Sequence, residues 1–160
     1  MIGEESRRLI PDSTDAPKFQ APDPDFLARV RDSFGNQSVM RLMGASLTRL
    51  EAGKATITLP FRSDLAQQDG FVHAGVVSTV ADSAGGYAGF TLMPKGSRVL
   101  TTEYKMHFLA PAKGERFEAT GTVVKAGRTL TVCELRVEAV EDGKRTLCAY
   151  GTQSLICIQG

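Results

Sequence analysis

The stretch QQDGFVHAGVVSTVADSAGG, residues 67–86, decides the fold because it contains a long helical pattern. When residues 75–91 are wound at 100° per residue, small apolar side chains gather in one stripe. The members of this stripe are Val77, Val80, Ala81, Ala84 and Ala88, with Val76 and Tyr87 at its flanks. We therefore expect a helix over residues 74–92 whose apolar stripe packs on a sheet.

The opposite side of this predicted helix combines a single acid with several glycines. Its residues are Gly75, Ser78, Asp82, Gly86 and Gly89, with Gly85 at its edge. A glycine inside a helix costs about 1 kcal/mol relative to alanine, so the pattern indicates that a substrate or another subunit approaches the backbone closely. A solvated surface acid beside a face that packs on a neighbouring helix would give the same pattern, so both interpretations stay open here.

The start of the predicted helix offers a second chemical feature. His73, Ala74 and Gly75 bring free backbone N–H groups to a positive helix end, which suits a developing oxyanion. Ala74 and Asp82 are separated along the helix by about 12 Å of helical rise. Because they cannot act on one carbonyl within one subunit, we expect two copies to pair with antiparallel helices. Each site would then be shared across a dimer.

The rest of the chain alternates mainly with the period of strands. Residues 23–35 predict a short amphipathic helix with Asp23 as its cap and Gly35 as its stop, and residues 45–61 predict a hairpin. Four alternating runs follow the long helix, and their short connections predict a meander of antiparallel neighbours. The runs are residues 99–110, 115–126, 128–141 and 145–158. The expected class is α+β, with one long helix against an antiparallel sheet of about six strands.

Length and composition narrow the class further. The 160 residues fit one domain, which we place at residues 23–160 after a poorly ordered lead-in at residues 1–22. A formal charge of +1 gives no basic field for nucleic acid. The amino-terminal MIGEESRR lacks the pattern of a signal peptide, and no segment approaches the ~18 apolar residues of a membrane span. We expect a cytoplasmic protein without a membrane partner.

The cysteines and histidines give no sign of a metal site. Cys133, Cys148 and Cys157 lie in strand-like apolar runs without CxxC spacing, where a thiol behaves as a small hydrophobe. His73 and Asp82 could together bind a metal, but a third ligand is missing from their surroundings in the sequence. We expect inert core thiols and no metal.

These features resemble the hotdog-fold acyl-CoA thioesterases, in the branch of the phenylacetate-degradation thioesterase and the mammalian thioesterase superfamily members. The resemblance covers residues 45–158, and its most specific part is the pattern G-x-x-H-x-G followed by an acid nine positions after the histidine. In this chain the pattern is formed by Gly70, His73, Gly75 and Asp82. The resemblance implies the hotdog fold and hydrolysis of an acyl-CoA thioester to the free acid and CoA.

The resemblance also implies roles for individual residues. Asp82 takes the place of the general base or nucleophile, and the backbone N–H of Ala74 takes the place of the oxyanion donor. Thr101 matches a hydroxyl that holds the attacking water, and Gln67 stands where asparagine is commoner. His73 either orients the loop through a hydrogen bond or takes part in acid–base chemistry.

Coenzyme A is part of the substrate in this family, so no separate cofactor is expected. Its phosphates require a local cationic patch, for which Arg98, Lys125 and Arg128 are the candidates. The resemblance further implies a homodimer, and a homotetramer built as a dimer of dimers. A hotdog enoyl-thioester hydratase or dehydratase and a non-catalytic acyl-CoA binding module are the alternatives that the sequence leaves open.

Overall fold

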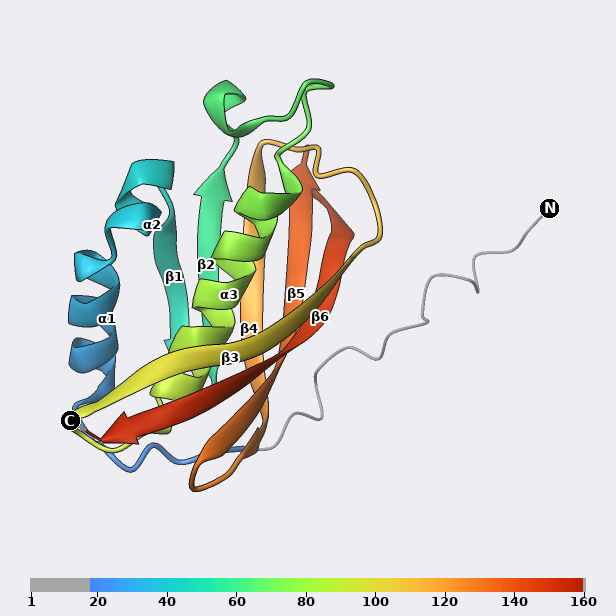
Figure 1. Cartoon of the computed structure of the whole chain (residues 1–160). Helices are drawn as coiled ribbons and strands as arrows, with labels where there is room; N and C mark the ends of the chain where they lie inside the picture. The colour runs from blue at the N-terminus through green and yellow to red at the C-terminus, as the bar shows by residue number, and fades with distance from the viewer. Residues whose placement is uncertain (1–17, 160) are drawn as a thin grey trace.

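A six-stranded antiparallel sheet curls round one long helix in the computed structural model, which describes residues 18–159 (Figure 1). The strand order is β1-β2-β4-β5-β6-β3. The strands are β1 (Ser46–Glu51), β2 (Lys54–Pro60), β3 (Ser97–Phe108), β4 (Arg116–Ala126), β5 (Leu130–Glu141) and β6 (Lys144–Gln159). The helix α3 (Ala74–Phe90) lies along the concave face of this sheet, and the expected α+β class is confirmed.

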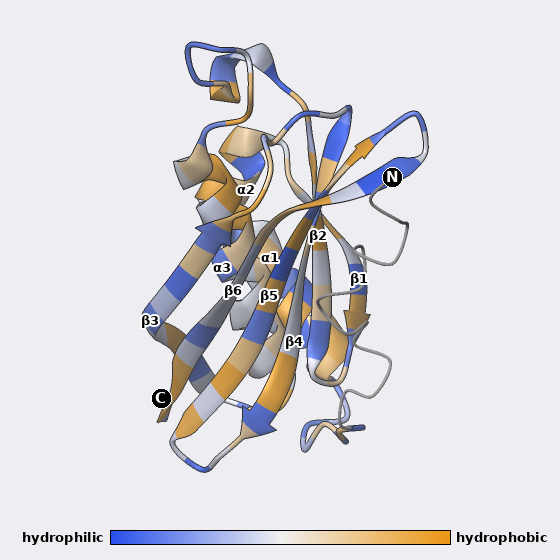
Figure 2. Cartoon of the chain, turned by 90° about the vertical axis from the view of Figure 1, so that its right-hand side faces the viewer, coloured by the Kyte–Doolittle hydropathy of each residue, from blue (hydrophilic) through white to orange (hydrophobic). Residues whose placement is uncertain are grey.

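The helix α3 is held by its N-cap and by the predicted apolar stripe. His73 has an extended backbone, and its Nδ1 accepts a hydrogen bond from the N–H of Gly75 at 2.9 Å. The five residues of the stripe, Val77, Val80, Ala81, Ala84 and Ala88, are each at most 1% exposed. Hydrophobic and hydrophilic residues alternate along β4 and β5, so that one face of these strands meets the helix (Figure 2).

Two of the glycines expected to face a substrate or a partner are buried against the sheet of the same chain, which corrects that expectation. A Cβ on Gly89 would collide with Leu155, and a Cβ on Gly85 would collide with Gln153. On β4, a Cβ on Gly121 would collide with the backbone of Gly85. The backbones of α3 and β4 therefore touch, and the close approach that the glycines indicated is largely intramolecular.

The prediction of a four-stranded meander was wrong for β3. This strand pairs with β6 at the edge of the sheet, while β4 pairs with β2 and β5. The connection of residues 109–115 therefore crosses the end of the sheet, where the N–H of Val72 donates to Ala112 and the N–H of Glu115 donates to Val140. Proline and glycine in this connection fit a hairpin and a crossing equally well, so composition could not distinguish them.

Two short helices, α1 (Phe26–Asn36) and α2 (Ser38–Met43), precede β1 and lie beside it (Figure 1). Asp23 is not the cap of α1, contrary to prediction, because Asp25 occupies that position. The carboxylate of Asp23 accepts instead from the N–H of Asp25 and from Arg29, and these contacts hold the pKa of Asp23 below its usual range. Gly35 lies inside α1 and does not stop it.

Most of the predicted lead-in lies outside the described residues, because the structure describes only its last five, residues 18–22. Just before the first helix, Phe19 packs against the core beside Gly53. Within residues 18–159, no helix is long and apolar enough to cross a membrane.

Another short helical turn, η3 (Ser63–Leu65), lies in the loop between β2 and α3. The turn after it contains Gly70, whose positive φ of 83° favours glycine. This loop leads directly into the N-cap of α3, so it helps to fix the position of the helix start.

Candidate active site

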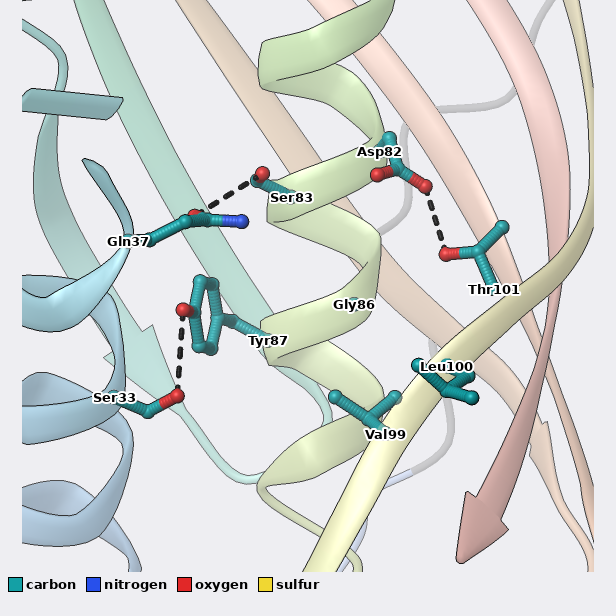
Figure 3. A pocket seen from close by; sticks show the side chains of 9 residues that line it. All are labelled: Ser33, Gln37, Asp82, Ser83, Gly86, Tyr87, Val99, Leu100 and Thr101. Carbon is teal, nitrogen blue, oxygen red and sulfur yellow. Dashed lines mark hydrogen bonds between the residues drawn. The ribbon is translucent and has the colours of Figure 1, made fainter. Parts of the chain in front are cut away.

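The half-buried carboxylate of Asp82 lies in the middle of α3 and is held by side chains from two strands. Thr101 on β3 donates through Oγ1 to Asp82 Oδ1 at 2.8 Å (Figure 3), and Gln153 on β6 donates through Nε2 to the same oxygen at 2.7 Å. Within residues 18–159, Asp82 Oδ2 receives no hydrogen bond. One oxygen of the carboxylate is therefore anchored, and the other is open to a water or a substrate.

An irregularity in β3 lies at the residue that contacts Asp82. The register between β3 and β6 shifts between Thr101 and Glu103, and the intervening Thr102 donates through Oγ1 to the carbonyl of Ser154 at 3.1 Å. A bulge bends a strand and redirects its side chains. The shift accounts for a hydroxyl of an edge strand reaching a carboxylate on the central helix.

A cavity of about 350 Å³ lies beside Asp82, between α1, α3 and β3 (Figure 3). Its lining residues are Ser33, Gln37, Asp82, Ser83, Gly86, Tyr87, Val99, Leu100 and Thr101. Ser83 Oγ donates to Gln37 Oε1 at 3.3 Å, and the hydroxyls of Ser33 and Tyr87 are 3.4 Å apart. Burial raises the pKa of Tyr87, so its phenol stays neutral at physiological pH. The cavity thus combines apolar walls with neutral polar groups beside one carboxylate.

The predicted oxyanion donor lies at a different cavity. Ala74 and Gln67 line a space of about 230 Å³ with residues from the 109–115 connection and its neighbours. Asp82 does not line this space, and the helical rise places it about 12 Å from Ala74. Within one chain, the carboxylate and the helix start therefore face separate cavities.

The helix start leaves one N–H group unused. The side chain of His73 occupies the N–H of Gly75, whereas the N–H of Ala74 makes no hydrogen bond within residues 18–159. Ala74 is exposed, so this donor is accessible to a ligand. His73 acts as the N-cap, which agrees with its predicted alternative role as a hydrogen-bonding residue of the loop.

Gln67 has a structural contact of its own. Its Oε1 accepts a hydrogen bond from the N–H of Asp69, and its backbone bonds with Phe71 and Gly70. The amide of Gln67 therefore helps to close the loop before α3, and its role toward a substrate stays a prediction.

The structure places two of the three predicted phosphate contacts, Arg98 and Arg128, at the same end of the sheet. Lys125 and Arg128 flank the turn between β4 and β5, whereas Arg98 is near the start of β3. Two strands lie between β4 and β3, so Lys125 is at least about 14 Å from Arg98 at the usual strand spacing. Only β6 lies between Arg128 and Arg98, because the end of β6 bonds with Thr129 and pairs with Arg98, and this separation is about 10 Å. All three side chains belong to exposed residues, and their contact with coenzyme A stays a prediction.

The cysteines have the surroundings of unreactive thiols. Burial raises the pKa of Cys133 to about 12 and the pKa of Cys148 to about 11. Cys157 is half-buried and free. In the described part of the chain, no three His, Cys, Asp or Glu side chains form a group that could hold a metal ion.

Gln153 is the site residue that the sequence did not reveal. It is 71 residues from Asp82 and belongs to no recognisable motif. The available signal was its place in β6, where the inward-facing residues Ala149, Gly151 and Leu155 are small or apolar. A polar amide at such a position indicates a specific partner.

The curled sheet, the central helix and the carboxylate beside a cavity define a class of protein. The sheet and the helix are those of the hotdog fold, and in this chain the helix carries an acidic side chain in its middle and an unused N–H group at its start. Such a site can activate a water with the carboxylate and stabilise an oxyanion at a helix start.

Comparison with known proteins identifies the family. The sequence pattern of the thioesterase superfamily matches residues 69–146. A thioesterase family protein from Silicibacter pomeroyi is 47% identical, with a TM-score of 0.83, over 84% of this chain and 99% of that chain. The proofreading thioesterase EntH of Klebsiella pneumoniae is 27% identical over 81% of this chain and 93% of its own. This chain belongs to the thioesterase superfamily and is a thioester hydrolase.

A more distant structure agrees on the fold. The PaaI protein from the phenylacetic acid degradation operon of E. coli is 18% identical, with a TM-score of 0.76, over 85% of this chain and 95% of that chain. The likeness to this protein supports the predicted hotdog fold.

Proposed function

We propose that this chain hydrolyses acyl-CoA thioesters, with Asp82 as the catalytic carboxylate and the N–H of Ala74 as the oxyanion donor. The observation that carries the proposal is the carboxylate of Asp82, which Thr101 anchors at 2.8 Å while one oxygen stays open beside a cavity of about 350 Å³. The cavity would receive the acyl group. Arg98, Lys125 and Arg128 are the proposed contacts of the CoA phosphates, and no cofactor takes part.

The proposed reaction is a general-base hydrolysis. Asp82 removes a proton from a water, and the water oxygen attacks the thioester carbonyl carbon. The carbonyl oxygen becomes an oxyanion that accepts a hydrogen bond from the N–H of Ala74. Collapse of this intermediate breaks the C–S bond and releases the free acid and the CoA thiolate, to which the protonated Asp82 returns its proton. Direct attack by the carboxylate, through an anhydride that water then opens, is the other course that the same residues allow.

The site requires two subunits in this proposal, because Ala74 and Asp82 face separate cavities within one chain. The edge strand β3 offers the surface for such pairing. It is 12 residues long, pairs on one side with β6, and exposes Leu100, Tyr104 and Phe108. A long edge strand with apolar side chains tends to pair with another strand. Pairing of two β3 strands would produce a homodimer, and two such dimers the proposed homotetramer.

A hydratase mechanism has less support. It needs a histidine that exchanges a proton with the substrate, whereas His73 is the N-cap of α3. The Nδ1 of His73 is also occupied by Gly75.

Replacement of the carboxylate tests the proposed function. Asp82→Asn should lower kcat by at least about a hundredfold, because the amide cannot accept a proton from water. Release of CoA from a panel of short, long and aromatic acyl-CoAs would be followed with a thiol-reactive dye. Asp32→Asn, a change at an exposed acid of α1, serves as the matched control and should leave kcat unchanged. An Asp82→Asn protein that keeps most of its activity would exclude the proposed role.

A further inference from the structure

We propose that Gln153 is a positioning residue of this hydrolase, which fixes the carboxylate of Asp82 in the orientation needed for attack. The inference rests on the proposed role of Asp82 and adds a residue to it. Three observations carry it: the contacts of the amide nitrogen, the space that α3 leaves for the amide, and the unpaired amide oxygen.

The amide nitrogen of Gln153 is committed to Asp82 and its neighbour. Nε2 lies 2.7 Å from Asp82 Oδ1, 3.0 Å from the carbonyl oxygen of Asp82 and 2.9 Å from Thr101 Oγ1. An NH₂ group has two hydrogens, so these three contacts use its full donor capacity. Thr101 also donates to Oδ1, which closes a triangle of hydrogen bonds around this single carboxylate oxygen.

The orientation of the amide follows from the charge of its partner. An ionised carboxylate only accepts hydrogen bonds, so the nitrogen of Gln153 must face it. The amide oxygen then points the other way, toward Gly85. A Cβ at Gly85 would occupy the place of this oxygen, although alanine is favoured over glycine inside a helix by about 1 kcal/mol. The glycine at position 85 of α3 therefore leaves the space that the amide of Gln153 fills.

Within residues 18–159, the amide oxygen of Gln153 makes no hydrogen bond that would stabilise the fold. The side chain belongs to a residue that is 1% exposed, and its Oε1 has no hydrogen-bond partner in the described part of the chain. A buried polar atom without a partner destabilises a fold. A methionine of similar size would fill this space without that cost, and it would lack only the hydrogen bonds that Nε2 makes. The useful part of Gln153 is the nitrogen that holds Asp82.

For catalysis, the two oxygens of the Asp82 carboxylate have different roles in this proposal. With Oδ1 fixed by Gln153 and Thr101, and the backbone carbonyl of Asp82 bound by the same nitrogen, the side chain cannot rotate freely about its bonds. Oδ2 is thereby held toward the water that it deprotonates. Loss of such positioning lowers the rate of attack without weakening the binding of the acyl-CoA.

The variant Gln153→Met tests this role. We expect kcat to fall about 10- to 100-fold, as for a misplaced catalytic group, while KM changes less than about twofold. The melting temperature should change little, because removal of the unpaired Oε1 offsets part of the loss of the hydrogen bonds that Nε2 makes. Gln159→Met, the same change at an exposed position of β6, is the matched control and should behave like the wild type. A kcat of Gln153→Met equal to that of the control would overturn the proposal.

A double variant separates positioning from a general structural effect. If Gln153 acts through Asp82, adding Gln153→Met to Asp82→Asn should change the residual rate less than about twofold. A further loss by the same factor as in the wild type would overturn the proposal. Full activity of Asp82→Asn by itself would instead refute the proposed function on which the inference rests.

If Gln153→Met does not fold, the proposal can still be tested on proteins that keep Gln153. Nuclear magnetic resonance of glutamine side chains labelled with nitrogen-15 should show one NH₂ signal that is protected from exchange and shifts in Asp82→Asn. If no glutamine side-chain signal differs between the two proteins, Gln153 does not contact Asp82 as proposed.

Discussion

Two inactive variants should restore activity when their subunits are mixed, if each site takes Asp82 from one subunit and Ala74 from the other. One variant is Asp82→Asn. The other is Ala74→Pro, which removes the unused N–H at the first position of α3. Proline is favoured at this position, and the backbone of the preceding His73, with φ −60° and ψ 138°, is the conformation that a following proline prefers. The substitution should therefore remove the donor and leave the helix intact.

The expected size of the recovery follows from the symmetry of the dimer. Loss of one oxyanion donor lowers kcat by about 10²- to 10³-fold, so each parent should show about 1% of wild-type activity or less. After random exchange, about half of the dimers are mixed, and each mixed dimer has one intact site and one site with both groups missing. The mixture should therefore reach about a quarter of wild-type activity, and purified mixed dimers about half.

The assay uses two affinity tags to isolate mixed dimers and the release of CoA to measure their activity. Each variant mixed with a differently tagged copy of itself is the control for the exchange procedure. Mixed dimers that contain both tags and are no more active than their parents would refute the shared site. Activity of Ala74→Pro close to the wild type would show that its N–H is not the oxyanion donor.

The remaining predictions concern the site and the thiols. Thr101→Val should lower kcat about tenfold, as expected for one hydrogen bond to a charged group, with circular dichroism to confirm the fold; an unchanged kcat would contradict a role in holding the carboxylate. Gln67→Ala should lower kcat strongly and Gln67→Asn should keep much of it, and equal kinetics of wild type and Gln67→Ala across several acyl-CoAs would contradict the predicted contact. In a Cys157→Ser protein, Cys133 and Cys148 should not react with a thiol reagent between pH 7 and 9, because their pKa values of about 12 and about 11 keep both thiols protonated; rapid labelling of the folded protein would contradict this.

Local patterns predicted most of the elements. The apolar stripe of α3 recurs with the period of a helix, so its buried face could be derived without any knowledge of its neighbours. The same holds for the alternating strands, whose bounds agree with the prediction to within a few residues. The position of β3 next to β6 could not be derived in this way, because it depends on where the chain returns after α3. The glycines were misassigned for the same reason, since Gly85 and Gly89 face strands that follow much later in the sequence.

For the candidate site, too, residues close together in the sequence could be predicted, and residues joined only by tertiary packing could not. The spacing of His73, Ala74 and Asp82 lies within one segment and was visible in the sequence. The contact of Asp82 with Gln153 joins two residues 71 positions apart, and no spacing rule links them. Helix α1 contributes Ser33 to the cavity, which depends on how that helix packs beside α3. Such contributions arise only from tertiary packing.

The pairing of β3 with β6 also has a consequence for the order in which activity can appear during synthesis. The helix that carries Asp82 and the strand that carries Thr101 emerge from the ribosome long before β6. Without β6, β3 has no neighbour in the sheet and the amide of Gln153 is missing. Until β6 has been made, the carboxylate of Asp82 therefore lacks the restraint that Gln153 provides. Full hydrolysis would then begin only after β6 has been made and has joined the sheet. Truncation within β6 should therefore abolish turnover before it abolishes helical structure.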